Sequence, residues 1–349
     1  MSVNPFGSIR TATMSLMNEV LPVAVRELLL DFIRCDQGRG IIHEQHMIDI
    51  FALSPSYPAL KEIDFDTYAK GEERERHGPT MTVEDAEDIV KQAELAQTLG
   101  QNKAGWNMMV NWPLLTDAMG FQDGGLVFAT PITSAKMIKD YFLIHGNLHL
   151  IHFAIVVNSR ASNAAYTAIP PGTPTPATVS SQIPLCNPKV LSDIISKLYE
   201  NLPERAINHI ESSSLWKESL NISIQTRENS PDDEAEAADQ QLCTHHSAQW
   251  QLLEDLVSLS GGSFEGLPFL PAVTVTGHYW SLVVTTRVPS INSEEAVTTL
   301  WTKQAFGSTD DVVGVYKVIW GLQRLQRWVE KVFWPWYRVN ALGLPSLTL

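Results

Sequence analysis

An apolar stripe near the C-terminus constrains the fold of this chain more than any other feature. Its residues recur at intervals of three or four positions: Val312, Val315, Ile319, Leu322, Leu325, Val329 and Val332. This spacing is typical of a long helix that packs one face against a core. Four tryptophans crowd the same region, at positions 320, 328, 334 and 336. Burial in an aromatic core explains them better than a platform for stacked bases does.

Shorter patterns predict a mixture of further helices and strands. Helical spacing covers residues 21–34, 82–99, 106–119, 190–202 and 238–259, so the opening hundred residues should be mainly helical. Short apolar or alternating runs predict strands over 149–157, 221–226, 272–276 and 280–286, the last two joined at Gly277. A proline-rich connection between residues 170 and 188 lacks either pattern. No internal repeat is present, so we expect one α/β unit.

The distribution of charge argues against nucleic acid as a partner. The chain has 25 basic and 39 acidic residues, a formal net charge of −14. Acidic residues are concentrated over residues 61–94 and 228–239, and we expect the second run to be an acidic loop. Binding to nucleic acid depends largely on Lys and Arg that neutralise phosphates. The acidic loop would instead suit a basic protein partner.

Neither the cysteines nor the apolar segments predict an exported or membrane protein. Cys35, Cys186 and Cys243 lie far apart and form neither a disulfide framework nor a metal-binding pair. No signal peptide and no apolar run long enough for a membrane span is evident. We therefore expect an intracellular, cytoplasmic protein, with the nucleus also open.

Histidines offer one candidate metal site. His145, His149 and His152 have the spacing of ligands on one helical face, which would suit zinc. The segment predicts a strand better than a helix, however, and on a strand positions 149 and 152 point to opposite faces. The pair His245 and His246 has no metal-ligand spacing, and we expect it on a helix surface.

Several segments together form a distinctive ordered pattern. They are WNMMVNWPLL (106–115), INHI (207–210), SIQTR (223–227), SAQW (247–250), LPFLPAVTVTGHYW (267–280) and the long run over 300–338, which contains GVY, GLQRL and WPW in that order. Together they resemble the fungal PD-(D/E)XK nuclease-like family. The resemblance implies a small mixed sheet flanked by helices. We expect residues 101–349 to form this core and residues 1–100 to form a helical N-terminal extension packed on it.

The resemblance also implies where catalytic residues should lie. Such nucleases bind Mg²⁺ through acids on two strands, in patterns like K-M-V-D-F and I-E-T-K, and the metal offsets the charge that develops during phosphodiester cleavage. In this chain His152 stands at the Asp position, Gln225 at the acid and Arg227 at the lysine. Imidazole and carboxamide are poor ligands for Mg²⁺, and Arg cannot act as a base. We therefore expect no metal, no other cofactor, and no nuclease activity.

Two functions from different classes fit this altered motif. The first is a metal-independent enzyme that cyclises or rearranges a small, largely apolar molecule, a chemistry found in fungal specialised metabolism. His152, Gln225 and Arg227 would be catalytic, and the substrate would be bound by His149, His278, Tyr279 and Trp280. The second is a non-catalytic pseudonuclease, a binding or interaction module in which His152, Gln225 and Arg227 are a polar cluster satisfied within the protein. An active Mg²⁺-dependent nuclease is a third hypothesis, which the altered motif disfavours.

Overall fold

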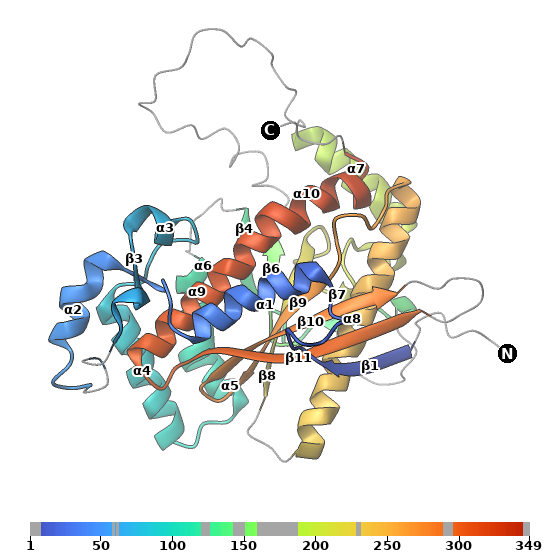
Figure 1. Ribbon diagram of the computed structural model, residues 1–349. Helices are drawn as coiled ribbons and strands as arrows, with labels where there is room; N and C mark the ends of the chain where they lie inside the picture. The colour runs from blue at the N-terminus through green and yellow to red at the C-terminus, as the bar shows by residue number, and fades with distance from the viewer. Residues whose placement is uncertain are drawn as a thin grey trace, which may run out of the picture.

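A seven-stranded mixed sheet organises the protein, in the order β1-β11-β10-β9-β8-β6-β4 (Figure 1). The computed structural model describes residues 8–57, 60, 63–119, 126–141, 151–158, 188–227, 232–288 and 296–344. The strands of this sheet are β1 (Ser8–Thr13), β4 (Val127–Pro131), β6 (Phe153–Val157), β8 (Ser219–Arg227), β9 (Leu270–Thr276), β10 (Tyr279–Val288) and β11 (Val297–Ser308). β1 pairs with β11 and β8 with β9 in parallel, and the other neighbours are antiparallel.

Two small ladders and a set of helices complete the fold. The ladders pair β2 (Ile42–His43) with β3 (Tyr68–Ala69) and β5 (Lys136–Met137) with β7 (Ile210–Glu211). The α-helices are α1 (Val23–Asp36), α2 (Met47–Ala52), α3 (Gly71–Glu75), α4 (Val83–Thr98), α5 (Lys103–Trp106), α6 (Trp112–Met119), α7 (Pro188–Asn201), α8 (Asp232–Ser260), α9 (Val312–Trp328) and α10 (Trp334–Trp336). Short 3₁₀ turns cover Glu44–His46, Phe65–Thr67, Lys139–Tyr141 and Pro203–Arg205. π-helical turns cover Asn107–Asn111, Val329–Phe333 and Tyr337–Ala341.

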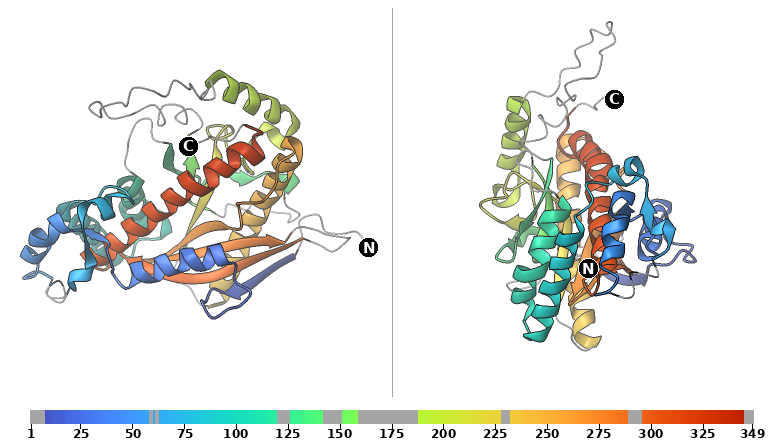
Figure 2. Two further views of the ribbon diagram at one scale, coloured as in Figure 1. Left: turned by 45° about the horizontal axis from the view of Figure 1, so that its top comes forward. Right: turned by 90° about the vertical axis from the view of Figure 1, so that its left-hand side faces the viewer.

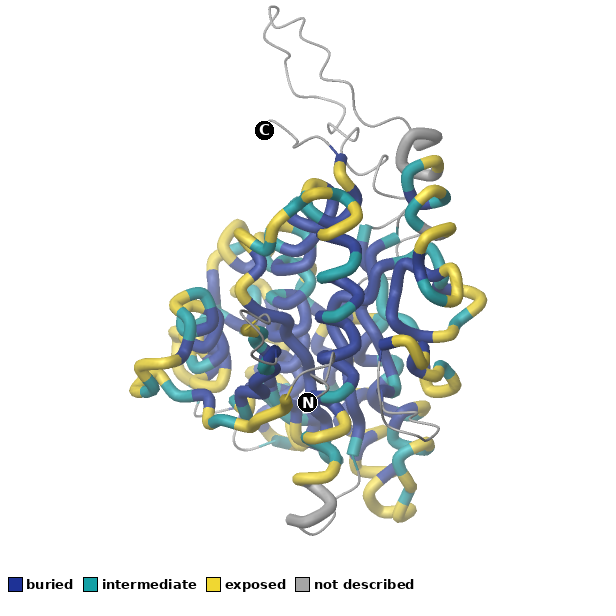
Figure 3. Tube along the Cα trace, turned by 90° about the vertical axis from the view of Figure 1, so that its right-hand side faces the viewer, coloured by how far each residue is buried: buried dark blue, intermediate teal, exposed yellow. Residues whose placement is uncertain are grey.

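Helices cover both faces of the sheet. α1 and α9 lie together on one face, and the long α8 crosses the opposite face (Figures 1 and 2). Figure 3 shows the buried positions running through the sheet and the inward sides of the helices, with exposed positions around the outside. β8 is buried along almost its whole length, because it lies between the two helical layers. This mixed α/β architecture confirms the expected fold class.

The C-terminal stripe forms α9 as predicted, and small residues set how closely α9 approaches the sheet. A Cβ added to Gly307 on β11 would come within 2.8 Å of the backbone nitrogen of Val318, and one added to Gly321 within 2.6 Å of the ring of Phe306. Phe306 in turn meets Phe32 of α1 edge to face, at 5.0 Å between ring centroids. Glycine at these positions allows helix and strand to pack at short range.

Local signals also placed α1 and α4 correctly. Pro22 immediately precedes α1, a position where its missing N–H costs no helical hydrogen bond. α4 begins after Thr82, whose hydroxyl accepts a hydrogen bond from the backbone N–H of Asp85. It ends before Gly100, which has a φ of +60°. The helix predicted over 106–119 begins earlier, at Lys103, and contains the π-helical turn Asn107–Asn111.

Several expected elements differ from the structure. The acidic run was expected to be a loop, but from Asp232 onward it forms the start of α8, where carboxylates are favoured by the helix dipole. β1, β4 and β11 were missed because their polar residues interrupt the apolar pattern. β1 also joins the main sheet, so residues 8–13 are not helical.

The expected boundary at residue 100 between an N-terminal extension and the core stays a prediction. The proline-rich connection lies outside the described residues up to Pro188, where α7 begins. No helix among the described residues is both long enough and apolar enough to cross a membrane.

Candidate functional site

The strands β6 and β8 bring three of the predicted site residues together. His152 immediately precedes β6, and its backbone N–H donates to the carbonyl of Ile224 at 3.1 Å. Its own carbonyl accepts from the N–H of Ile132 at 2.9 Å. The next residue, Phe153, is the register partner of Ile224. His152 is therefore held beside residues 224–226 of β8, next to Gln225 and near Arg227.

The His152 ring is a neutral, internally bonded group. Its Nδ1 accepts a hydrogen bond from the backbone N–H of Thr226 at 3.1 Å, which places the ring proton on Nε2. Burial, together with the positive charge of Lys103, lowers the pKa of His152 to about 4. To act as a base or a ligand through Nδ1, His152 would have to give up a backbone hydrogen bond.

Gln225 and Arg227 form an ionic cluster with α8. They lie two residues apart on β8, and the Oε1 of Gln225 accepts from Nε and Nη2 of Arg227 at 3.0 and 2.8 Å. Nη2 of Arg227 also lies 2.6 Å from Oδ1 of Asp239, and the two side chains are only 8% and 19% exposed. Asp239 belongs to the acidic run that was expected to form a loop. Nε and Nη2 of Arg227 are thus engaged within the protein.

The predicted substrate-binding residues are not gathered at one place. His278 lies in the β9–β10 turn, where its Nδ1 is 3.0 Å from Thr309 Oγ1 and 3.3 Å from Asp310 Oδ1. Its Nε2 is 3.2 Å from Gln97 Oε1. Tyr279 is 61% exposed, whereas Trp280 is fully buried. His149, like His145 of the three-histidine hypothesis, lies outside the described residues.

A family model described as the PD-(D/E)XK nuclease superfamily matches residues 53–334. The chain belongs to this superfamily. No curated protein and no solved structure matches the chain significantly. The matched range includes β6, β8 and α8, so the cluster around His152 and Arg227 lies within the superfamily domain.

The donor groups around His152 and Arg227 do not fit the Mg²⁺ that the superfamily implies. A hard divalent cation requires anionic oxygen ligands. Among the described residues the carboxylate at this position is that of Asp239, and it already pairs with a guanidinium. Gln225 directs its carbonyl oxygen at the same guanidinium, and no group of three His, Cys, Asp or Glu side chains arranged to bind a metal occurs in the described part of the chain. We derive no metal-dependent step from this site.

Sequence reasoning placed one histidine pair wrongly. His245 and His246 are buried inside α8 rather than exposed on its surface. Nε2 of His245 lies 2.9 Å from Nε2 of His209, and Nδ1 of His246 lies 2.8 Å from Oγ1 of Thr285. The signal was the absence of any charged residue from 240 to 253, which is unusual for an exposed helix. Helical periodicity alone does not predict the burial of this pair, because α8 is covered both by the sheet and by the segment around β7.

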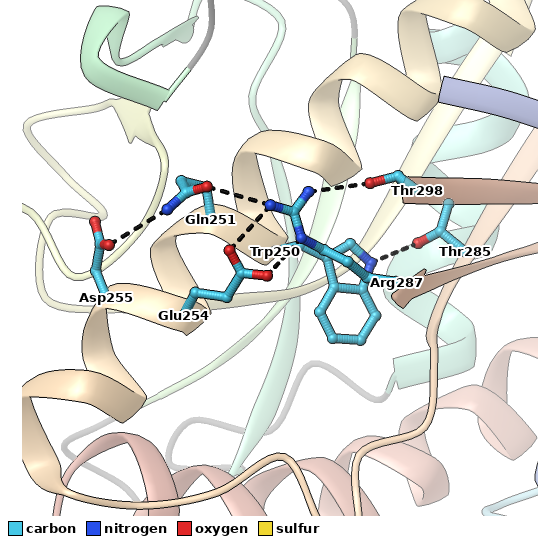
Figure 4. Close-up of polar contacts among 7 residues, drawn as sticks. All are labelled: Trp250, Gln251, Glu254, Asp255, Thr285, Arg287 and Thr298. Carbon is cyan, nitrogen blue, oxygen red and sulfur yellow. Dashed lines mark hydrogen bonds and ion pairs between the residues drawn. The ribbon is translucent and has the colours of Figure 1, made fainter. Parts of the chain in front are cut away.

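A second ionic cluster joins α8 to the sheet (Figure 4). Arg287 of β10 binds both carboxylate oxygens of Glu254, at 2.6 and 2.9 Å, and donates to Oγ1 of Thr298 at 3.1 Å. Nη2 of Arg287 also donates to Gln251 at 3.2 Å. Bidentate Arg–carboxylate pairs have strict geometry. This cluster therefore fixes α8 on β10 and β11 and serves the fold.

Proposed function

We propose that this protein is a pseudonuclease, a member of the PD-(D/E)XK superfamily that serves as a binding module and does not cleave phosphodiester bonds with Mg²⁺. One observation carries the proposal: Arg227 contacts both Gln225 and Asp239, so a compensated ion pair lies where the resemblance expects metal-binding acids. A guanidinium remains protonated at any physiological pH and repels a cation.

The expectation of a metal-independent enzyme finds less support. To act as a base, His152 needs its unprotonated ring nitrogen, and this Nδ1 already accepts from the N–H of Thr226. Arg227 would need to direct its donors at a substrate, but they bond to Gln225 and Asp239. Three clefts lined by described residues lie elsewhere, around Arg327, Asn340 and Trp216. The geometry therefore favours the binding module over an enzyme for a small apolar molecule.

The proposal is tested with the full chain and a variant that rebuilds the acidic motif. The wild-type protein should give no Mg²⁺ binding heat in calorimetry and should leave plasmid and linear DNA intact with Mg²⁺ or Mn²⁺. The variant H152D/Q225E/R227K introduces the residues that the family pattern implies, and it should gain measurable Mg²⁺ binding. Cleavage by the wild-type chain that stops with EDTA and is lost in Arg227→Gln would overturn the proposal.

A further inference from the structure

A cleft with a surplus of positive charge lies between α1, α3 and α9. It has a volume of about 470 Å³. It is lined by Asp31, Glu73, Arg76, His77, Arg324, Arg327, Trp328, Lys331 and Val332. Four of these residues are Arg or Lys and two are acids, a surplus of two positive charges on a chain whose net charge is −14.

The spacing along α9 explains why the cations gather. Arg324 and Arg327 of α9 and Lys331 of the π-helical turn that continues it recur at three and four residues, so they gather along one side of the helix. α1 runs beside this helix, and Asp31 of α1 pairs with Nε of Arg324 at 2.8 Å. The turn after α3 adds Arg76, whose backbone carbonyl accepts a hydrogen bond from Arg327.

Three of the lining cations form no ion pair within the described residues. Asp31 is engaged by Arg324, whereas Arg76, Arg327 and Lys331 form no ion pair there, and Arg76 and Lys331 are exposed. Glu73 is the remaining acid of the lining, and it forms no ion pair with a described residue either. Positive charge at the mouth of this cleft is thus left available to an anion.

A buried cation close to the cleft strengthens its positive field. Arg74 is fully buried, and its guanidinium bonds to neutral acceptors: the carbonyls of Ile41 and Gly78 and Oε1 of Gln323. Burial, together with the charges of Arg74, Arg327 and Arg324, lowers the pKa of His77 to about 4, so this lining ring is neutral. Charges surrounded by protein act over a longer range than exposed ones, because they are screened less.

Two lining side chains have hydrogen-bonding atoms without a partner. Nδ1 of His77 and Nε1 of Trp328 are buried, and neither bonds to another described residue. The Trp328 residue is only 3% exposed. A buried indole N–H without an acceptor costs free energy, so such groups in native proteins are generally satisfied by water or by a ligand.

We propose that this cleft binds a small organic phosphate, with Arg76, Arg327 and Lys331 as its anion ligands. The surplus of two positive charges matches the dianion of a phosphate monoester, and the Arg fork matches its oxygens. The volume suits a ligand of sugar-phosphate or mononucleotide size. A long polyanion is disfavoured, because the rest of the chain is acidic. This inference concerns a different site from the one around Arg227 and does not depend on the proposed function.

Isothermal titration of the full chain tests the site with ribose 5-phosphate, pyrophosphate and ribose. The two phosphates should bind and ribose should not. The double variant R76Q/K331Q should weaken phosphate binding at least tenfold, because these exposed cations make no ion pair that the fold would lose. The control K136Q/K303Q removes the same charge from exposed lysines outside the cleft and should change the affinity less than twofold.

Three results would overturn the inference. The first is an absence of binding by both phosphates at low salt. The second is an equal loss of affinity in R76Q/K331Q and in the control, which would indicate attraction by overall charge. The third is tighter binding of a short DNA duplex or of malonate than of ribose 5-phosphate, which would assign the cleft to a different class of anion.

Discussion

Arg227 belongs to the candidate site and also contributes to the stability of the folded protein. Its charge is buried against Gln225 and Asp239, and an ion pair of this kind has a small net effect when intact but a large one when a single partner is removed. The same contact holds β8 to α8. At the residue scale, therefore, this ion pair acts as a structural cross-link between the sheet and the helix.

Replacing Arg227 with Ala should lower the free energy of unfolding by roughly 3–5 kcal/mol, since it leaves the carboxylate of Asp239 buried and unpaired. The double variant R227A/D239A should recover part of this loss, and chemical denaturation of the three proteins measures it. A loss below about 1 kcal/mol for Arg227→Ala would show that the pair behaves like an exposed salt bridge.

At the scale of elements, the close contact of α9 with β11 and α1 depends on a glycine, which has no side-chain atoms to keep them apart. Gly321 faces the ring of Phe306, with Phe32 close behind it. An alanine ordinarily stabilises a helix interior relative to glycine by about 1 kcal/mol. Here the added methyl group has no room, because protein interiors are closely packed and rings held by neighbours cannot move freely.

Gly321→Ala should therefore destabilise the protein by about 1–3 kcal/mol, despite the better helix propensity of alanine. Gly105→Ala is the control outside this contact, because its new methyl group meets only Gln101, whose amide can swing away while its Cβ, at 2.9 Å, must shift slightly. Thermal unfolding of both variants distinguishes the two effects. A stabilised Gly321→Ala protein would show that α9 lies farther from Phe306 than in this structure.

At the scale of the whole molecule, buried histidines couple the fold to pH. Burial lowers the pKa of His209 and His246 to about 3, and that of His245 well below its ordinary value. In the unfolded chain these rings would titrate near pH 6.5. The unfolded state therefore binds more protons below that pH, so folding stability decreases as the pH falls from about 6.5 toward 3.

We expect the free energy of unfolding to fall steeply between pH 6.5 and pH 4, with each of these histidines adding up to about 1.4 kcal/mol per pH unit. His246→Gln should make the dependence shallower by about that amount over the same window. Urea denaturation at several pH values measures both slopes. An unchanged slope in the variant would mean that His246 is accessible to protons in the folded protein.

The sequence by itself determined the long C-terminal helix, the caps of α1 and α4, the hairpin at Gly277 and the superfamily. These features depend on local periodicity, on turn chemistry, or on ordered motifs, all of which can be recognised without knowing which residues are in contact. It also placed His152, Gln225 and Arg227 in one region, because neighbouring strands of a known fold bring them together.

Only the tertiary structure decided what those residues do. The partner of Arg227 is Asp239, twelve positions farther along the chain, where the acidic run meets the start of the helix predicted over 238–259. The burial of His245 and His246 depends on a second layer that covers α8, and the pairing of β1 with β11 joins the two ends of the chain. Long-range contacts of this kind leave no periodic trace, because their partners are selected by packing in three dimensions.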